Sequence, residues 1–204
     1  MNSEPFEDES AKARKILGEM TDEARWRLFP IILCEYSPEY PERFLREKAR
    51  LEAKLGAARI ARLNHIGSTS VPGLLAKPTI DLLMEIDPSW DVKELTGLLE
   101  GADYLATAQP QSPAPHLTFL KGYTPRGFAR EVFHLHIRFS GDWDELYFRD
   151  YLCAHPDVTE EYAERKTELA RQFEFNRDAY TAAKGEFVQT YTRRARMKFT
   201  GRYS

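Results

Sequence analysis

The sequence predicts an α/β or α+β domain, in which helices flank a mixed β-sheet and a helical segment follows it. Three observations predict this fold class. Short apolar runs bounded by glycine and proline alternate with charged, helix-patterned segments as far as residue 139. From residue 142 onward the pattern is helical. The 204 residues, of which 42% are hydrophobic, suffice to bury one full core.

The first elements predicted are a helix over residues 10–28 and a strand over residues 29–36. Ser10 is a suitable N-cap for the helix, and apolar residues follow it at helical spacing. The strand is a short apolar run closed by a Ser-Pro turn. We therefore divide the chain into an N-terminal helical extension, residues 1–28, and a domain of residues 29–204.

Helices and strands then alternate along the chain. A charged helix ends at Gly56, and a strand ends at Gly67. The strand that follows is the most apolar, which favours a central position in the sheet. The predicted elements are a helix over 39–55, strands over 58–66 and 78–86, a helix over 91–101, strands over 104–108, 116–123 and 131–139, and helices over 143–154, 156–175 and 177–199.

Composition and charge exclude several classes of protein. With 29 basic and 32 acidic residues the net charge is -3, so a nucleic-acid partner is not expected. No apolar run approaches the roughly 20 residues needed to cross a membrane, and we do not expect the acidic N-terminal residues to form a secretory signal. The two cysteines, Cys34 and Cys153, lack the spacing of a zinc site and are expected to be reduced thiols. We expect a cytoplasmic protein with no membrane partner.

The densest chemical pattern is a turn of Gly67, Ser68, Thr69 and Ser70 that follows a predicted strand. Glycine lets a ligand approach the backbone closely, and free N–H groups and hydroxyls at the start of a helix bind anions. The alternative interpretation is that these residues only cap a short helix. On this segment alone the two interpretations have equal weight.

A carboxylate lies within the most apolar predicted strand. Asp81 has no structural need there unless something pairs with it. Strand alternation places it on one face with Leu83 and Glu85. In nucleotidyltransferases, a carboxylate that follows a phosphate-binding Gly-Ser pair by one short turn holds Mg²⁺ against the triphosphate of the substrate. The sequence therefore predicts Asp81 as a magnesium ligand.

This part of the chain resembles the signature of the GrpB family, a branch of the nucleotidyltransferase-like superfamily. The resemblance rests on residues 65–74 (HIGSTSVPGL) and 76–81 (AKPTID), and extends to 133–136 (FHLH), 148–152 (FRDYL), Lys166, Tyr180 and Lys184. It covers most of the chain, from residue 29 to residue 195. It implies a mixed β-sheet of nucleotidyltransferase-like fold, flanked by helices, with a pocket at the Gly-Ser turn.

The chain departs from the pattern of active superfamily members at one position. Those members carry two acidic residues at i and i+2 of one strand, which reach a pair of metal ions about 3.5–4 Å apart. Here the i+2 residue is Leu83, and Glu85 lies about 13 Å from Asp81 along an extended strand. We therefore expect one metal ion or none, and impaired two-metal chemistry.

The strand over 131–139 presents His134, His136 and Arg138 on one face, and three interpretations are open. The three groups bind the phosphates of a ligand. Alternatively, His134 and His136 join Asp81 as metal ligands. In the third interpretation the face is solvated and has no function. Strand alternation alone favours the solvated face. With the resemblance at His136 taken into account, phosphate binding is as well supported as the solvated face, and metal ligation is less well supported than either.

The remaining candidates are basic or imidazole groups. Lys77 lies in the loop that leads into the apolar strand, and the family motif supports a role for it at the mouth of the pocket. Arg149 either points into the site or pairs with nearby acids. Lys166 and Lys184 lie on predicted helices, where a solvated position is the plainer interpretation and only the resemblance assigns them to the ligand. His65 either orients the turn or is a structural histidine.

We expect the protein to bind a nucleotide or a nucleotide-derived phosphorylated ligand. If Mg²⁺-dependent nucleotidyl transfer takes place, Asp81 and Lys77 are the predicted catalytic residues. One alternative is a non-catalytic sensor that has lost the second metal carboxylate. A second alternative is a metal hydrolase built on His134, His136 and Asp81.

Overall fold

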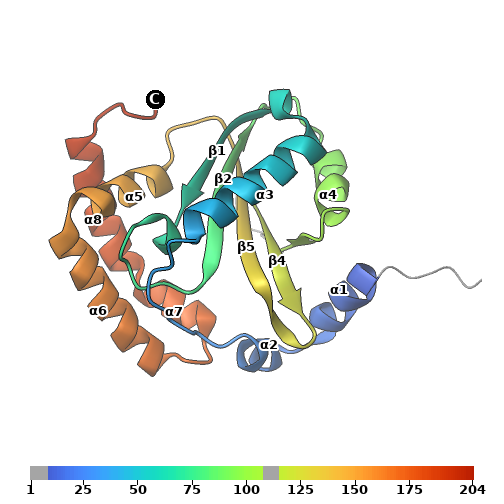
Figure 1. Ribbon diagram of the computed structural model, residues 1–204, viewed down its shortest axis with the longest axis horizontal. Coiled ribbons are helices and arrows are strands. Elements are labelled where there is room, and N and C mark those ends of the chain that lie inside the picture. The colour runs from blue at the N-terminus through green and yellow to red at the C-terminus, as the bar shows by residue number, and fades with distance from the viewer. Residues whose placement is uncertain (1–8, 108–114) are drawn as a thin grey trace, which may run out of the picture.

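A five-stranded mixed β-sheet forms the centre of the computed structural model, which describes residues 9–107 and 115–204. The strand order is β1-β2-β5-β4-β3; β2 and β5 run parallel, and every other neighbouring pair is antiparallel (Figure 1). The strands are β1 (Ile60–Ile66), β2 (Thr79–Ile86), β3 (Leu105–Ala106), β4 (Leu117–Thr124) and β5 (Gly127–Phe139). The predicted fold class, a mixed sheet flanked by helices, is confirmed.

Helices lie on both sides of this sheet. The α-helices are α1 (Glu9–Glu19), α2 (Asp22–Leu28), α3 (Tyr40–Leu55), α4 (Val92–Glu100), α5 (Asp144–Ala154), α6 (Pro156–Gln172), α7 (Arg177–Ala183) and α8 (Gly185–Lys198). Short 3₁₀ turns, η1 (Ala57–Arg59) and η2 (Ser68–Ser70), precede and follow β1. Helices α5 to α8 form the predicted C-terminal helical segment and gather at one side of the sheet (Figure 1).

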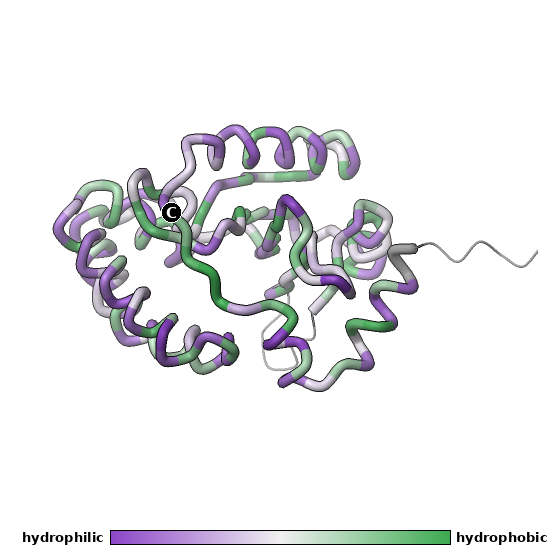
Figure 2. The backbone as a smooth tube through the Cα atoms, turned by 60° about the horizontal axis from the view of Figure 1, so that its bottom comes forward, coloured by the Kyte–Doolittle hydropathy of each residue, from purple (hydrophilic) through white to green (hydrophobic). Residues whose placement is uncertain are grey.

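The main core lies between the sheet and the pair α3 and α4. Leu51 and Leu55 of α3 and Leu95 and Leu99 of α4 belong to one buried cluster with apolar residues of β2 and β5. Along the tube of Figure 2 the helices alternate between hydrophilic and hydrophobic residues, as expected where one stripe of a helix faces a core. Burial of these stripes holds the two helices on that face of the sheet.

The opposite face of β2 meets the C-terminal helices. Leu83 on this face is fully buried against Ile66 of β1 and Leu146 of α5. Asp81 and Glu85 share the face, because strand residues two apart point the same way. The functional side of the sheet is therefore enclosed by α5 and the helices that follow it.

The N-terminal part of the chain differs from the prediction in two ways. The helix expected over 10–28 is divided, because the Thr21 hydroxyl accepts the N–H of Ala24 and begins a second helix. The strand expected over 29–36 is wrong: only Cys34 forms an isolated bridge, to Ala76. The N–H of Ile31 instead donates to the carbonyl of Glu174, so this extended segment joins a helix end rather than the sheet.

Other boundaries move as well. Strand β5 begins at Gly127 rather than at residue 131, and β3 contains only Leu105–Ala106. Ala108, the last residue expected in that strand, lies outside the described residues. The helix expected over 177–199 is divided at Lys184, directly before Gly185. Within the described ranges no helix is long and apolar enough to cross a membrane.

Candidate functional site

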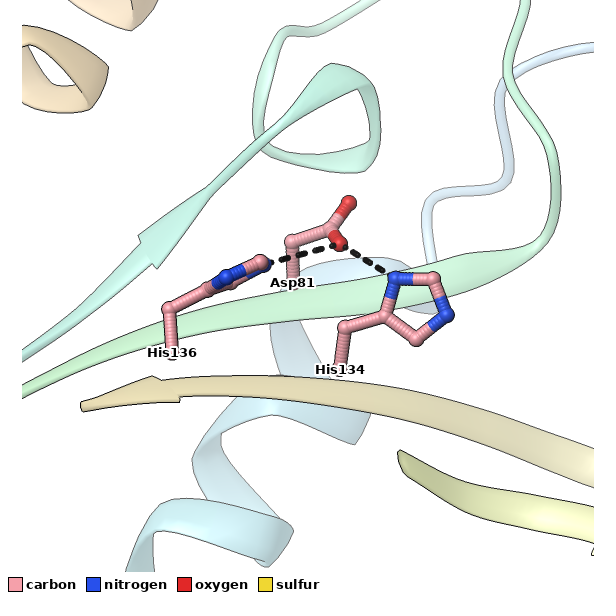
Figure 3. Close-up of side chains that lie close together, drawn as sticks. All are labelled: Asp81, His134 and His136. Atoms are coloured by element: carbon pink, nitrogen blue, oxygen red, sulfur yellow. Dashed lines mark hydrogen bonds and ion pairs between the residues drawn. The ribbon is translucent and has the colours of Figure 1, made fainter. Parts of the chain in front are cut away.

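Asp81, His134 and His136, called the Asp-His cluster below, meet at the centre of the sheet. Asp81 pairs with His134 in the parallel register of β2 and β5, so both side chains leave the sheet on the same face. His134 Nδ1 lies 3.0 Å from Asp81 Oδ1, and His136 Nε2 lies 3.7 Å from the same oxygen (Figure 3). The three side chains are half-buried, so the interpretation of a solvated face is wrong.

Side chains of strand β4 contact the second ring nitrogen of each imidazole, the one that does not face Asp81. Tyr123 Oη lies 2.8 Å from His134 Nε2, and Thr118 Oγ1 lies 3.4 Å from His136 Nδ1. The guanidinium of Arg177 donates to Tyr123 Oη at 2.7 Å. Since that oxygen already accepts from Arg177, its own hydrogen is free to go to His134 Nε2. In this arrangement the Nδ1 hydrogen of His134 points at Asp81.

These contacts shift the ionisation of the Asp-His cluster. Burial by itself raises the pKa of Asp81, but the hydrogen bonds and the charges of His134 and His136 outweigh burial and hold that pKa far below its ordinary value. Burial lowers the pKa of His134 despite the neighbouring Asp81 carboxylate. The cluster therefore contains an ionised carboxylate beside an imidazole that favours its neutral form.

The Gly67 turn, residues 67–70, passes directly beside Asp81. Gly67 has φ +71°, a conformation that favours glycine. Thr69 is buried and donates to the carbonyl of Thr79 at 2.9 Å, while Ser70 Oγ donates to the Gly67 carbonyl at 2.6 Å. Thr69 and Ser70 therefore use their hydroxyls inside the turn, which corrects their assignment to the ligand. Ser68 is the hydroxyl of the turn that faces a basic residue.

Four basic residues, called the basic cluster below, collect near this turn: Lys77, Lys166, Arg177 and Lys184. Lys166 is only 2% exposed and donates to Ser68 Oγ at 3.1 Å and to the carbonyl of Leu75. Its expected solvated position is therefore wrong. Lys77 Nζ and Lys184 Nζ lie 5.7 and 4.2 Å from the centre of the Tyr180 ring. The structure thus brings together the three lysines that the sequence singled out.

The pKa values of the three lysines are low because of burial and mutual repulsion. Burial, followed by the charges of Arg177 and Lys184, lowers the pKa of Lys77 to about 7. Burial, followed by the charges of Lys184 and Lys77, lowers that of Lys166 to about 7. Burial lowers the pKa of Lys184 to about 8, although the Asp81 carboxylate acts in the opposite direction. The basic groups of the site therefore lie close enough to one another for their positive charges to interact.

Two arginines predicted to bind the ligand have other roles. The Arg149 guanidinium donates to the carbonyl of His65 at 2.9 Å and pairs with Asp150, so it fixes the end of β1. Arg138 donates to main-chain carbonyls and lies 3.6 Å from Glu145. These two arginines are therefore corrected from ligand-binding to structural groups.

His65 lies behind the Gly67 turn. Its Nε2 is 3.0 Å from Thr69 Oγ1, and its ring stacks on Phe44 at 5.0 Å between centroids. Because Thr69 donates its hydrogen to the carbonyl of Thr79, His65 Nε2 is the donor in this contact. Burial lowers the pKa of His65 to about 4. His65 is thus a neutral structural histidine that orients the turn.

A cavity of about 650 Å³ opens beside the Asp-His cluster. Its volume falls within the range of sites for small ligands and cofactors. Apolar and aromatic side chains of the C-terminal helices form one wall, and acidic residues at the start of α5 form part of the rim. Its lining includes Gly67, Asp81 and His136 on the sheet side, and Trp143, Phe148 and Tyr162 on the helical side.

Sequence reasoning missed two residues of the site, Tyr123 and Arg177. Tyr123 is one of many aromatic residues on apolar strands, and its contact with His134 depends on the pairing of β4 with β5. Arg177 reaches Tyr123 from α7, which follows it by 54 positions in the sequence. No local pattern marks either residue, because both contacts are long-range.

The chain matches proteins of one family over most of its length. The family model described as "GrpB protein" matches residues 30–194. A UPF0157 protein of Halalkalibacterium halodurans is 32% identical over 199 residues, which cover 94% of this chain and 97% of the relative. A UPF0157 protein of Pseudomonas aeruginosa is 37% identical over 159 residues, and the match spans 78% of this chain but 64% of the relative.

One solved structure and one further protein sequence add two similarities. The crystal structure of the conserved protein GrpB from Enterococcus faecalis superposes with a TM-score of 0.70 at 27% identity, covering 82% of this chain and 99% of that one. A protein of Mycolicibacterium paratuberculosis named dephospho-CoA kinase is 28% identical over 190 residues, which cover 81% of this chain and 46% of that protein.

Proposed function

The chain belongs to the GrpB protein family, and from that membership we propose that it binds a nucleotide or nucleotide-derived phosphorylated ligand beside the Gly67 turn. The phosphate lies between the turn and the basic cluster. The remainder of the ligand occupies the cavity that Trp143 and Phe148 line. The proposal rests on one observation above all, which is the gathering of four basic groups whose three lysines have lowered pKa values.

Asp81 acts on the basic cluster through its charge, which raises the pKa of Lys77 and of Lys184, but it does not form an ion pair with either lysine. Within residues 9–107 and 115–204, none of its four members forms an ion pair with a carboxylate. Like charges held together in a partly buried site are unfavourable, and the lowered pKa values of its lysines express this cost. A phosphate group carries the negative charge and the acceptor oxygens that such a site lacks. An anionic ligand would therefore relieve the repulsion.

The aromatic wall of the cavity supports the choice of a nucleotide over inorganic phosphate. Phe148 and Tyr162 lie edge to face, with ring centroids 5.4 Å apart, on the helical side of the cavity. Flat aromatic and apolar surfaces suit a base, whereas a bare anion would leave them unused. The similarity to a protein named dephospho-CoA kinase agrees with a nucleotide-derived ligand. Because the chain spans 46% of that protein, the kinase activity itself is not carried over.

The surroundings of Leu83 favour a non-catalytic binding protein over a transferase. Leu83 takes the position of the second metal carboxylate, and it is fully buried against Leu146 of α5. Two-metal nucleotidyl transfer therefore has one anchor, Asp81, instead of two. In this proposal a divalent ion enters only as a companion of the ligand phosphates, and Lys77 acts as a phosphate-binding residue.

Calorimetric titration with ATP, coenzyme A and inorganic phosphate tests the proposal. We expect binding of a nucleotide-derived ligand, and the double variant Lys77→Gln/Lys184→Gln should weaken it at least about tenfold, which corresponds to about 1.4 kcal/mol. Lys93→Gln is the matched control, because Lys93 is exposed on α4 across the sheet. If no phosphorylated ligand binds, or if both variants lose affinity equally, the proposal is wrong. Release of labelled product in a parallel transfer assay would indicate an enzyme.

A further inference from the structure

We propose that the Asp-His cluster binds one divalent transition-metal ion of the zinc type, and that this ion contacts the phosphate of the ligand. The inference deepens the proposed function, because it assigns the ion that accompanies the phosphate. It stands on a separate set of side chains, and a metal titration without phosphate tests it on its own. Four features of the cluster support it.

The first feature is the spacing of the donor atoms. One donor atom from each of Asp81, His134 and His136 lies within 4.8 Å of the others. In a tetrahedral site with bonds of about 2.0–2.1 Å, the ligand atoms lie roughly 3.3 Å apart. Asp81 Oδ1 is 3.0 Å from His134 Nδ1 and 3.7 Å from His136 Nε2, so small side-chain rotations would admit the ion.

The second feature is the chemistry of the donors. Two imidazole nitrogens and one carboxylate oxygen suit zinc and its neighbours among the transition metals. Magnesium prefers six oxygen ligands in near-ideal octahedral geometry and is poorly held by imidazole. Asp81 supplies the carboxylate, while Leu83 and His136 stand where a magnesium site would need further oxygens. The donor set therefore selects against the Mg²⁺ expected from Asp81 alone.

The third feature is the support behind each imidazole. Metal-binding histidines use their second ring nitrogen to bond a polar group, which fixes the ring and its tautomer. Here Tyr123 Oη contacts His134 Nε2, and Thr118 Oγ1 is 3.4 Å from His136 Nδ1. With the ion present, His134 would carry its hydrogen on Nε2 and donate it to Tyr123, leaving Nδ1 as the metal ligand.

The fourth feature is an open side. Three protein ligands leave at least one coordination position of a tetrahedral ion to water or substrate. Asp81, His136 and Gly67 line the same cavity, so this position faces the proposed ligand site. Figure 3 shows the second carboxylate oxygen of Asp81 pointing away from both imidazoles, on the side of the Gly67 turn. A phosphate oxygen can therefore complete the coordination without displacing a protein ligand.

The test is a metal titration of the chelator-treated full chain in buffer free of phosphate. We expect one equivalent of Zn²⁺ to bind, and one equivalent of Co²⁺ to give visible absorption bands that Zn²⁺ abolishes. Excess Mg²⁺ should not displace either ion. Substoichiometric binding, or displacement by Mg²⁺, would show that the Asp-His cluster is only a hydrogen-bonded group.

Variants identify the ligands. His134→Gln and His136→Gln should each weaken Zn²⁺ at least about 100-fold, and Tyr123→Phe, which removes the support of one ligand, by about 10–100-fold. His155→Gln is the control, since His155 lies at the junction of α5 and α6 and bonds the carbonyl of Tyr151. Circular dichroism of each variant shows that it is folded. Unchanged affinity in both ligand variants, or equal loss in the control, overturns the proposal.

The outcomes separate this proposal from the proposed function. If the chain binds Zn²⁺ but none of the phosphorylated ligands tested, the metal site is supported and the ligand proposal is contradicted. Binding of a nucleotide by the metal-free chain, with the same affinity when Zn²⁺ is added, would support the ligand proposal and contradict the contact between ion and phosphate.

Discussion

The α-carbon of Gly67 lies directly against the side chain of Asp81. A Cβ placed on Gly67 would be 2.9 Å from Asp81 Cγ, closer than real Cβ atoms approach a heavy atom. The turn can therefore press its backbone against the carboxylate only because residue 67 has no side chain. The position of Asp81, and with it the Asp-His cluster, depends on this contact.

Gly67→Ala should displace Asp81 and abolish metal and ligand binding. Gly73→Ala is a matched control, because Gly73 has a similar φ of +78° but nothing within 4 Å of its added Cβ. Both variants bear the backbone strain of about 1–2 kcal/mol, whereas only Gly67→Ala collides with Asp81. Urea unfolding and Zn²⁺ titration of the two variants measure the difference. Equal unfolding free energies and equal Zn²⁺ affinities in the two variants would contradict the contact between Gly67 and Asp81.

The affinity for a phosphorylated ligand should fall as the pH rises from 7 to 9. Burial and neighbouring cations hold the pKa of Lys77 and of Lys166 at about 7, so both are largely neutral at pH 8 without a ligand. A bound phosphate favours their charged forms and raises both pKa values, so binding takes up protons. Calorimetry in two buffers of different ionisation enthalpy measures this uptake. Affinity that is constant or rises over this range would contradict the arrangement.

The same shifts predict how the ligand-free chain responds to pH. A lysine whose pKa is depressed by folding destabilises the folded state most where it is protonated in both states, below about pH 7. The free energy of unfolding should therefore rise with pH from about 7 towards the ordinary lysine pKa of about 10.4. Urea unfolding of the Lys166→Met variant should show a smaller rise than that of the parent chain.

Leu83→Asp should unfold the chain instead of restoring a second metal carboxylate. Leu83 is fully buried against Ile66 and Leu146, and a charge there has no partner and no water. We expect a loss of about 4 kcal/mol or more in unfolding free energy. Leu83→Met, of similar volume, should cost less than about 1.5 kcal/mol. A folded Leu83→Asp protein with Mg²⁺-dependent transfer activity would instead indicate a lost enzyme.

Arg62→Met should destabilise the chain by about 3–5 kcal/mol, because it leaves a buried carboxylate without its cation. Glu85 is fully buried and accepts two hydrogen bonds from Arg62, at 2.9 and 2.7 Å. The double variant Arg62→Met/Glu85→Gln should lose less, since the neutral amide can still accept the N–H of Gly141. Urea unfolding of the two variants provides the comparison. If the double variant loses as much unfolding free energy as Arg62→Met, or more, the cost does not come from the unpaired charge of Glu85.

The face on which each strand residue lies was predictable, whereas the pairing of strands was not. Alternation in β2 and β5 places Asp81, His134 and His136 on one side of their strands, as the sequence predicts. That the two strands are neighbours depends on a crossover of 40 or more residues, which no local pattern encodes. The register also places Arg138 opposite Glu85 instead of Asp81, which removes Arg138 from the cluster.

The burial of Lys166 follows from the periodicity of its helix. Lys166 lies four residues after Tyr162 and three before Leu169, both of which are buried. This spacing puts Lys166 on the apolar stripe of α6, where a lysine is unusual. A lysine on a long helix usually has a solvated position, but the place of Lys166 within the apolar stripe indicates a buried group.

The wide separation of the site residues along the chain affects when the proposed ligand site is complete during synthesis. Asp81 and the two histidines are made early, and Lys184 follows His136 by 48 positions, the difference of the two residue numbers. At about 5–20 residues per second a ribosome needs roughly 2–10 s to cover that stretch. Until translation has passed Lys184, the charges that would attract a phosphorylated ligand are incomplete. On the proposed function, a nascent chain that ends before Lys184 should therefore bind the phosphorylated ligand more weakly than the full chain.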